Sequence, residues 1–293
     1  MKKAYFKYII ALLLFGTNGI VASDISLSSY EIVYLRTLIG SILLVLIFVL
    51  TKGKLSFLQK KKQLLFLAVS GIALGTSWIF LYEAYQQIGV SFASLAYYCG
   101  PVIVMILAPI LFQERLTITK GIGFLTVLVG IFMVNGQLAG SGANRWGLFC
   151  GTMSAVMYSI MVIFNKKAKD ITGLENSMLQ LIFSFMTVAV FVTFQQGLNI
   201  HIERSDVAPV LILGLLNTGI GCYLYFSSIG RLGVQTVAIC GYLEPLSAVV
   251  FSVLLLREGM SLTQVIGATL ILFGAISGEL FELRNRRVGR ARC

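Results

Sequence analysis

Residues 242–274, YLEPLSAVVFSVLLLREGMSLTQVIGATLILFG, repeat a pattern already present in residues 98–130, YCGPVIVMILAPILFQERLTITKGIGFLTVLVG. In each copy a proline is followed thirteen residues later by a glutamate, and a tyrosine stands three residues before the proline. The pairs are Pro101 with Glu114 and Pro245 with Glu258. The spacing between the copies is 144 residues, about half of the chain. This spacing indicates that the chain consists of two related halves.

The composition indicates a membrane protein. Of 293 residues, 57% are hydrophobic and only 12% are charged, and the mean hydropathy is +0.89. A soluble domain carries roughly 25% charged residues. The length allows about ten spans of roughly 20 residues each, joined by short loops. No long polar segment remains for a soluble catalytic domain.

The apolar runs predict an all-α membrane protein with ten transmembrane helices, at residues 4–22, 30–50, 64–85, 92–112, 118–134, 146–164, 176–194, 207–227, 234–256 and 263–279. We expect a first five-helix repeat at residues 1–137, a second at 145–281 and a basic cytoplasmic tail at 282–293. Because each repeat has an odd number of spans, the two must face opposite sides of the membrane. Two inverted repeats with prolines inside their helices are typical of secondary transporters that work by alternating access.

The basic residues predict the orientation in the cell (inner) membrane. If both termini are cytoplasmic, only Arg145, Arg204 and Arg257 fall outside and Arg36 falls within a span. All remaining Lys and Arg residues then lie on the cytoplasmic side, as the positive-inside rule requires. The net charge of +11 therefore reflects topology, and no nucleic-acid partner is expected.

Further motifs extend the pattern over the whole chain. They are Phe15-Gly16-Thr17-Asn18, Arg36, Glu114-Arg115-Leu116-Thr117, Glu258-Gly259-Met260-Ser261-Leu262 and the closing segment 267–274. Together with the two proline–glutamate blocks, they resemble the drug/metabolite transporter superfamily, specifically its ten-span EamA-type branch. The resemblance implies a carrier that moves small metabolites, usually outward, such as amino acids, their derivatives or amines. Members differ in cargo, so the resemblance indicates the class of function and not the substrate.

Glu244 is the first candidate site residue. It directly precedes Pro245, whose missing N–H leaves one carbonyl of the preceding turn without its usual donor. Its counterpart in the first repeat is Gly100, so the charge is present in one repeat only. This asymmetry favours a site for a substrate ammonium group or a coupled proton. The alternative is a structural carboxylate that caps helix dipoles or pairs with Arg36.

Two further charged residues are candidates. Arg36 suits a substrate carboxylate, because its planar guanidinium binds carboxylates in a bidentate manner. It would alternatively snorkel to the interface or pair with Glu31 or Glu244. Glu83, near the outer end of the third span, is the second candidate for proton coupling after Glu244, or else lies among lipid headgroups.

Aromatic and amide side chains gather in the spans expected to line a central cavity. Trp78 and Tyr82 are four residues apart and share a helix face, and we expect Tyr98 and Tyr242 to face each other across the pseudo-axis. Tyrosine and tryptophan also populate interfacial belts, which is the alternative for each of them. The predicted substrate-binding residues are Asn18, Trp78, Tyr82, Tyr98, Tyr158, Asn217, Tyr223, Tyr242 and Glu244, and the neighbouring Tyr97 and Tyr225 belong to the same group.

Helix kinks are expected at Pro101 and Pro245. Glu114 and Glu258 end the fourth and ninth spans, where a helix C-terminus does not favour an anion. Each therefore needs a partner, and we interpret them as gate or scaffold residues. The glycines Gly121, Gly123, Gly130, Gly267 and Gly274 predict close packing of the fifth and tenth spans or a dimer seam, so the protein is a monomer or homodimer.

The predicted function is a secondary transporter, embedded in the lipid bilayer, that exports small metabolites (amino acids or related amines or drugs) across the cytoplasmic membrane by alternating access. No GxxxxGK[ST] motif is present, so the energy must come from a gradient. We expect no cofactor and no metal site, since the cysteines lack metal spacing and His201 lies in a loop. The alternatives are a carrier of a lipid-linked or nucleotide-type metabolite and, less well supported, an intramembrane enzyme. The enzyme would need acidic or Ser/His groups at depth, whereas Asp24, Asp170 and Asp206 fall in predicted loops.

Overall fold

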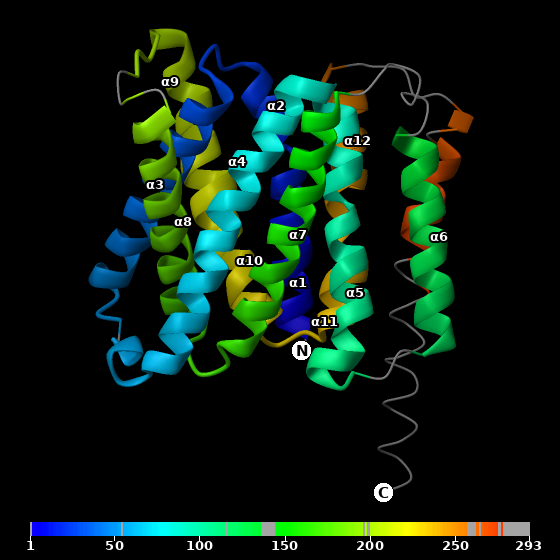
Figure 1. Ribbon diagram of the computed structural model, residues 1–293, viewed down its shortest axis with the longest axis horizontal. Coiled ribbons are helices and arrows are strands. Elements are labelled where there is room, and N and C mark those ends of the chain that lie inside the picture. The colour runs from blue at the N-terminus through cyan, green and yellow to red at the C-terminus, as the bar shows by residue number, and fades with distance from the viewer. Residues whose placement is uncertain are drawn as a thin grey trace, which may run out of the picture.

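The computed structural model describes residues 2–53, 55–114, 117–135, 144–195, 197, 200–256, 262–263, 265–274 and 277. Within these ranges the chain is helical and contains no strand, and its helices run alongside one another in a bundle (Figure 1). The predicted all-α class is therefore confirmed. The predicted basic tail at 282–293 lies outside the described residues, as do Arg115, Arg257 and Glu258.

Six helical segments are long and apolar enough to cross a membrane. They are Lys2–Ser23, Ser29–Leu50, Lys61–Ile88, Arg145–Lys167, Gly173–Gln195 and Arg204–Ile229, and three shorter apolar helices are Cys99–Phe112, Ile118–Met133 and Val265–Gly274. The chain is thus a multi-pass membrane protein. The number of ten spans stays a prediction.

Several predicted spans are interrupted helices. The first comprises α1 (Lys2–Gly16) and α2 (Asn18–Ser23), which are separated at Thr17. The eighth comprises α9 (Arg204–Leu211), a π-helix η3 (Ile212–Ile220) and α10 (Gly221–Ile229). The ninth comprises α11 (Val234–Gly241) and α12 (Leu243–Leu256). Asp206 lies inside α9 and is 1% exposed, so the prediction that it lies in a loop is wrong.

The third and fourth spans differ from the prediction in where the helix breaks. Helix α4 (Lys61–Tyr97) continues through the loop expected between Tyr85 and Phe92, and the break falls at Tyr98, before α5 (Cys99–Phe112). Tyr98 has φ −69° and ψ −3°, and its repeat mate Tyr242 has φ −72° and ψ −5°. The duplicated sequence thus produces the same backbone geometry twice.

Pro101 and Pro245 stand in the first turn of α5 and α12, immediately after these breaks. The first-turn N–H groups of a helix have no partner within the helix, so a proline costs little there. The kinks expected at the prolines therefore lie three residues upstream, at the tyrosines. In Figure 1, α5 descends from the upper end of the bundle whereas α12 ascends from α11, so the two repeat-related helices run in opposite directions.

The remaining long helices are α3 (Ser29–Leu50), α6 (Ile118–Asn135), α7 (Arg145–Lys167) and α8 (Gly173–Gln195), with a short 3-10 turn η1 (Ser56–Gln59). Helix α4 packs against α7 and α8, α3 against α8 and η3, and α1 against α10 and α12. Lipid supplies no hydrophobic force between helices, so small residues and interhelical hydrogen bonds must hold them. Ser77 and Ser154 join α4 to α7, each hydroxyl donating to the other's backbone oxygen (2.9 and 2.8 Å).

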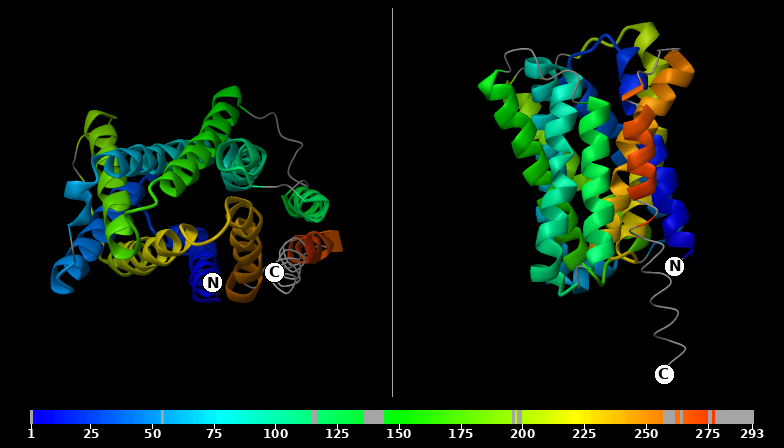
Figure 2. Two further views of the ribbon diagram at one scale, coloured as in Figure 1. Left: turned by 90° about the horizontal axis from the view of Figure 1, so that it is seen from below. Right: turned by 90° about the vertical axis from the view of Figure 1, so that its right-hand side faces the viewer.

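Glycines bring α6 and the last helix, Val265–Gly274, into backbone contact. A Cβ at Gly130 would lie 2.6 Å from the oxygen of Gly267, and one at Gly274 would lie 2.5 Å from that of Gly123. The two helices lie side by side at one edge of the molecule (Figure 2). The predicted small-residue packing of these helices is what the structure shows within one chain.

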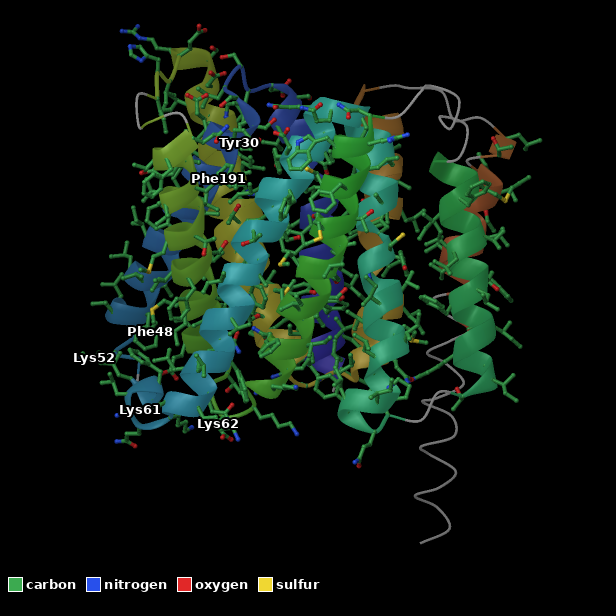
Figure 3. All side chains as sticks on the ribbon, viewed as in Figure 1. Tyr30, Phe48, Lys52, Lys61, Lys62 and Phe191 are labelled. Carbon is green, nitrogen blue, oxygen red and sulfur yellow. The ribbon has the colours of Figure 1, made fainter. Side chains whose placement is uncertain are left out.

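The two ends of the bundle differ in character. Lys52, Lys61 and Lys62 lie at the lower end in Figure 3, whereas Tyr30 and Phe191 lie toward the upper end with ring centroids 5.4 Å apart. Helix α11 lies at the same end as the three lysines (Figure 1). We refer below to this end as the lysine end.

Candidate functional site

Arg36 occupies the interior of the bundle. It is 3% exposed, although it lies on α3 among residues that face other helices. Its Nε donates to Thr218 Oγ1 of η3 (2.9 Å), and its Nη1 donates to Tyr82 OH of α4 (3.2 Å). Its guanidinium carbon lies 4.7 Å from the ring centroid of Trp78. The guanidinium therefore sits where three elements meet.

Trp78 and Tyr82 contact Arg36 from the same face of α4, as their spacing of four residues implies. Tyr82 is buried and Trp78 is half-buried. Thr218, which the sequence analysis did not single out, completes this group. Its hydroxyl donates to Leu213 O (2.8 Å), so its lone pairs are available to Arg36. The π-helical turn of η3 makes this bond possible, because Leu213 is five residues before Thr218.

Glu244 lies on α12 directly after the break at Tyr242 and is half-buried. It is within electrostatic range of Arg36 and of the hydroxyls of Tyr8, Tyr97, Tyr98 and Tyr158. These partners come from α3, α1, α4 and α7 and from the break before α5. Among the described residues no side chain donates a hydrogen bond to its carboxylate, and Ser247 Oγ donates only to its backbone oxygen (2.8 Å). Glu244 is therefore an acid inside the bundle without a direct protein partner.

The counterpart position in the first repeat is closed. A Cβ at Gly100 would lie 2.7 Å from Tyr158 Cδ1 and 3.1 Å from the backbone oxygen of Ala155. The ring of Tyr158 thus fills in one repeat the space that Glu244 occupies in the other. The sequence asymmetry between Gly100 and Glu244 corresponds to a real asymmetry of the interior.

Tyrosines form the wall beside Glu244. Tyr158 OH lies 3.2 Å from Tyr225 OH, and the ring of Tyr97 meets that of Tyr158 edge to face at 5.4 Å. Tyr8 stacks obliquely on Tyr225 at 5.3 Å and donates to Val237 O (2.8 Å). We call Arg36, Trp78, Tyr82, Thr218, Tyr8, Tyr97, Tyr98, Tyr158, Tyr225 and Glu244 the interior cluster. No sequence pattern indicated that Tyr8 faces the interior, because a tyrosine near the start of a first span is equally typical of an interfacial belt.

Three predicted binding residues form contacts between helices, whereas their role in binding stays a prediction. Tyr242 is completely buried, and its OH donates to the backbone oxygen of Tyr98 (2.9 Å), so the two repeat mates do meet. Asn217 Nδ2 lies within hydrogen-bond distance of Leu14 O (2.9 Å), Thr17 Oγ1 (2.8 Å) and Asn18 Oδ1 (3.0 Å). The amides of Asn18 and Asn217 therefore bridge the break of the first span to η3.

Tyr223 contacts Lys7 of α1. Lys7 Nζ is 3.4 Å from its OH, 3.3 Å from Ser227 Oγ and 4.7 Å from its ring centroid. The tyrosine therefore joins α10 to α1. Nothing in the sequence distinguished it from Tyr225, which is only two residues away and faces the interior.

Glu83 belongs to a separate network at the end opposite the lysine end. One carboxylate oxygen accepts from Tyr30 OH, and the other accepts from Gln87 Nε2 (3.0 Å) and Trp146 Nε1 (3.1 Å). The donors come from α3, α4 and α7, and all three are neutral. This arrangement fixes three helices together and uses both oxygens of Glu83.

Glu114 has hydrogen-bond donors around its carboxylate, as expected for an anion at the end of a span. Its two carboxylate oxygens accept from Val234 N (2.6 Å) and Gln235 N (3.1 Å), which are the first N–H groups of α11. Gly233, the residue before α11, has no side chain that could do this. The Gln235 side chain donates to Glu114 O (3.3 Å) and accepts from Lys120 Nζ (3.0 Å). An anion at a helix N-terminus is stabilised by the helix dipole.

The EamA-like transporter family model matches residues 2–136 and 145–277. The chain belongs to the EamA-like transporter family. Within the described residues, moreover, no group of three or more His, Cys, Asp or Glu side chains could hold a metal ion.

The relatives of this chain are also named as transporters. An uncharacterized transporter of Bacillus subtilis, YxxF, is 23% identical over 279 residues, which cover 92% of this chain and 88% of the relative. An uncharacterized inner membrane transporter of Salmonella typhimurium, YicL, is 24% identical over 305 residues, which cover 99% of this chain and 98% of the relative. A solved crystal structure superposes with a TM-score of 0.81 at 20% identity, covering 95% of this chain and 98% of the other, which shows the shared fold. This EamA-family protein is a membrane transporter, and family and relatives indicate transport rather than catalysis.

Proposed function

We propose that the protein is a secondary transporter of the cytoplasmic membrane that exports amino acids or related amines or drugs. The observation that supports this best is Glu244, an acid inside the bundle that lies among tyrosines and has no donor among the described side chains. A carboxylate inside a membrane-spanning bundle with no direct partner is costly even when it is half-buried. A substrate ammonium group or a proton placed against it would offset that cost.

The proposed mechanism is alternating access between two inverted repeats. Its support is the identical backbone break at Tyr98 and Tyr242, followed in each case by a helix that runs in the opposite direction to its mate (Figure 1). Broken helices at the middle of the membrane are where such transporters place their binding sites. Because the chain has no nucleotide-binding motif, the export is driven by a gradient.

We also propose that the lysine end faces the cytoplasm, as the positive-inside rule implies. The name of the Salmonella relative supports an inner-membrane location. A lipid-linked or nucleotide-type cargo is the second candidate. The interior cluster holds one cation, Arg36, among mainly aromatic groups, which gives a phosphate-bearing cargo little to bind.

The experiment is solute counterflow in proteoliposomes with radiolabelled amino acids, amines and nucleotides, comparing the native protein with Glu244→Gln. Glu203→Gln is the matched control, since Glu203 is exposed and its side chain caps no helix. We expect uptake of at least one amino acid or amine, lost in Glu244→Gln and kept in Glu203→Gln. Uptake of nucleotides alone would contradict the proposed cargo, and equal uptake by both variants would remove Glu244 from the site.

A further inference from the structure

Arg36 has one guanidinium nitrogen, Nη2, that donates to no acceptor among the described residues. A guanidinium carries five N–H donors. Nε uses one on Thr218 and Nη1 uses one on Tyr82, whereas Nη2 has no acceptor among the described residues. Buried polar groups in proteins are normally hydrogen-bonded. Although the Arg36 side chain is 97% buried, Nη2 is not one of the fully enclosed unpaired atoms of the described residues, which are Gln63 Oε1, Asn165 Oδ1 and Ser184 Oγ. Its free N–H groups are therefore accessible to an acceptor that the protein does not itself supply.

Glu244 is not the missing acceptor. Among the described residues no N···O contact within 4.0 Å joins a carboxylate to Arg36, although Glu244 and Arg36 are within electrostatic range of each other. A cation and an anion thus face one another inside the bundle without forming an ion pair. In a medium of low dielectric, a molecule with both charges would stabilise both residues at once.

The surroundings of Arg36 hold the guanidinium in one plane. The Trp78 ring lies 4.7 Å from Cζ, and Thr218 fixes Nε. A planar, pre-oriented guanidinium loses little conformational entropy when it binds a carboxylate. A lysine at this position would retain the charge but would lose the fixed, two-pronged geometry.

We infer that Arg36 determines specificity in this protein by binding the carboxylate of the transported molecule through its free Nη2 edge. The inference rests on the proposed function and narrows it. Of the two cargo classes, it selects amino acids, whose ammonium group would then lie toward Glu244, and it disfavours amines that lack a carboxylate. Arg36 is accordingly a binding residue, with Trp78, Tyr82 and Thr218 as the residues that position it.

The test is a thermal-shift titration of the detergent-purified full chain with each of the twenty L-amino acids and with the corresponding twenty L-amino acid amides. An amide retains the ammonium group and the side chain but lacks the carboxylate. We expect at least one acid to stabilise the native protein and to bind roughly 10- to 100-fold more tightly than its amide, which is the loss expected for a charged hydrogen bond. In Arg36→Gln the acid should bind as weakly as the amide does.

The matched control is Arg204→Gln, which removes an exposed arginine at the start of α9. It should keep the preference for the acid. If Arg36→Gln does not fold, Thr218→Val and Tyr82→Phe remove the positioning bonds one at a time and should each lower that preference. An amide that binds as tightly as its acid, or stabilisation by none of the acids, overturns the inference. Counterflow of an amine through the same protein would leave the proposed function intact.

Discussion

Asn217 is a polar residue at the middle of a predicted span, and its amide joins η3 to the break in the first span. Its amide nitrogen meets three oxygens at the point where the first span breaks between Gly16 and Asn18. A Cβ at Gly16 would lie 2.0 Å from Ser247 Oγ, so α12 also approaches this break very closely. In lipid, the amide supplies bonds that water would supply elsewhere. The break in the first span is therefore held by η3 on one side and by α12 on the other.

We predict that Asn217→Ala lowers the thermal stability of the purified protein but leaves the affinity for its cargo within about twofold. Interhelical hydrogen bonds in membrane proteins contribute about 0.6 kcal/mol on average and up to about 1.7 kcal/mol, and the two N–H groups of Asn217 Nδ2, which share three acceptor oxygens, are lost here. The measurement is a melting curve with and without the amino acid found in the titration. Thr152→Ala is the control, because Thr152 is exposed and its hydroxyl bonds only within α7 (Leu148 O, 2.8 Å).

Unchanged melting together with a large loss of affinity would show that Asn217 contacts the cargo after all. The sequence could not show whether Asn217 stabilises the fold or binds the cargo. Asn217, Tyr223 and Tyr242 are polar residues at mid-span positions, and their burial follows from how η3, α10 and α11 pack. Composition and spacing carry no information on that packing.

At the scale of elements, the sequence predicted helices well and their interruptions less well. The apolar runs placed the long helices to within a few residues, because a lipid-exposed span needs a continuous apolar stretch. The loop expected between Tyr85 and Phe92 is helical instead. The π-helix at 212–220 has no signature that a hydropathy pattern could reveal, yet it brings Asn217 and Thr218 to their partners.

Helix α11 depends on a cap from another part of the chain. It has only eight residues and precedes the break at Tyr242, and both oxygens of Glu114 hold its first N–H groups. Lys166 Nζ donates to the backbone oxygens of Ile229 (3.0 Å) and Leu232 at the end of α10. The link between α10 and α11 is thus held by a cation on one side and an anion on the other, each at the helix end that favours it.

We predict that Glu114→Ala destabilises α11 by about 1–2 kcal/mol, the usual cost of losing an N-terminal cap. Hydrogen exchange followed by mass spectrometry should show faster exchange in peptides that cover Val234–Gly241. Glu203→Ala is the control, since Glu203 is the residue before α9 and its side chain caps no helix. Equal exchange in α11 before and after Glu114→Ala would mean that the cap contributes nothing measurable.

At the scale of the molecule, the helices divide into a central bundle and a pair at its edge. The exposed side of α6 carries large apolar residues at intervals of three and four: Ile118, Ile122, Leu125, Val129 and Phe132. Its other side meets the last helix through glycines, so the seam is already used within one chain. A dimer built on α6 would have to use the large residues, which equally suit lipid.

Alternating access predicts that the lysine end must open during each cycle, and in this structure Glu114 joins the segment after α5 to the start of α11 at that end. A Cβ at Gly233 would lie 3.5 Å from Glu114 Oε2. In a background without the native cysteines, Glu114→Cys with Gly233→Cys can therefore be joined by a short bis-methanethiosulfonate reagent, which forms a reducible disulfide with each thiol and releases methanesulfinate. We expect the joined protein to lose counterflow and to recover it on reduction, while each single-cysteine variant treated alike keeps its rate.

Because the joint lies away from the interior cluster, the joined protein should still bind its amino acid in the thermal-shift titration. Undiminished counterflow in the joined protein would mean that this end does not open, and the inverted repeats would then move in some other way.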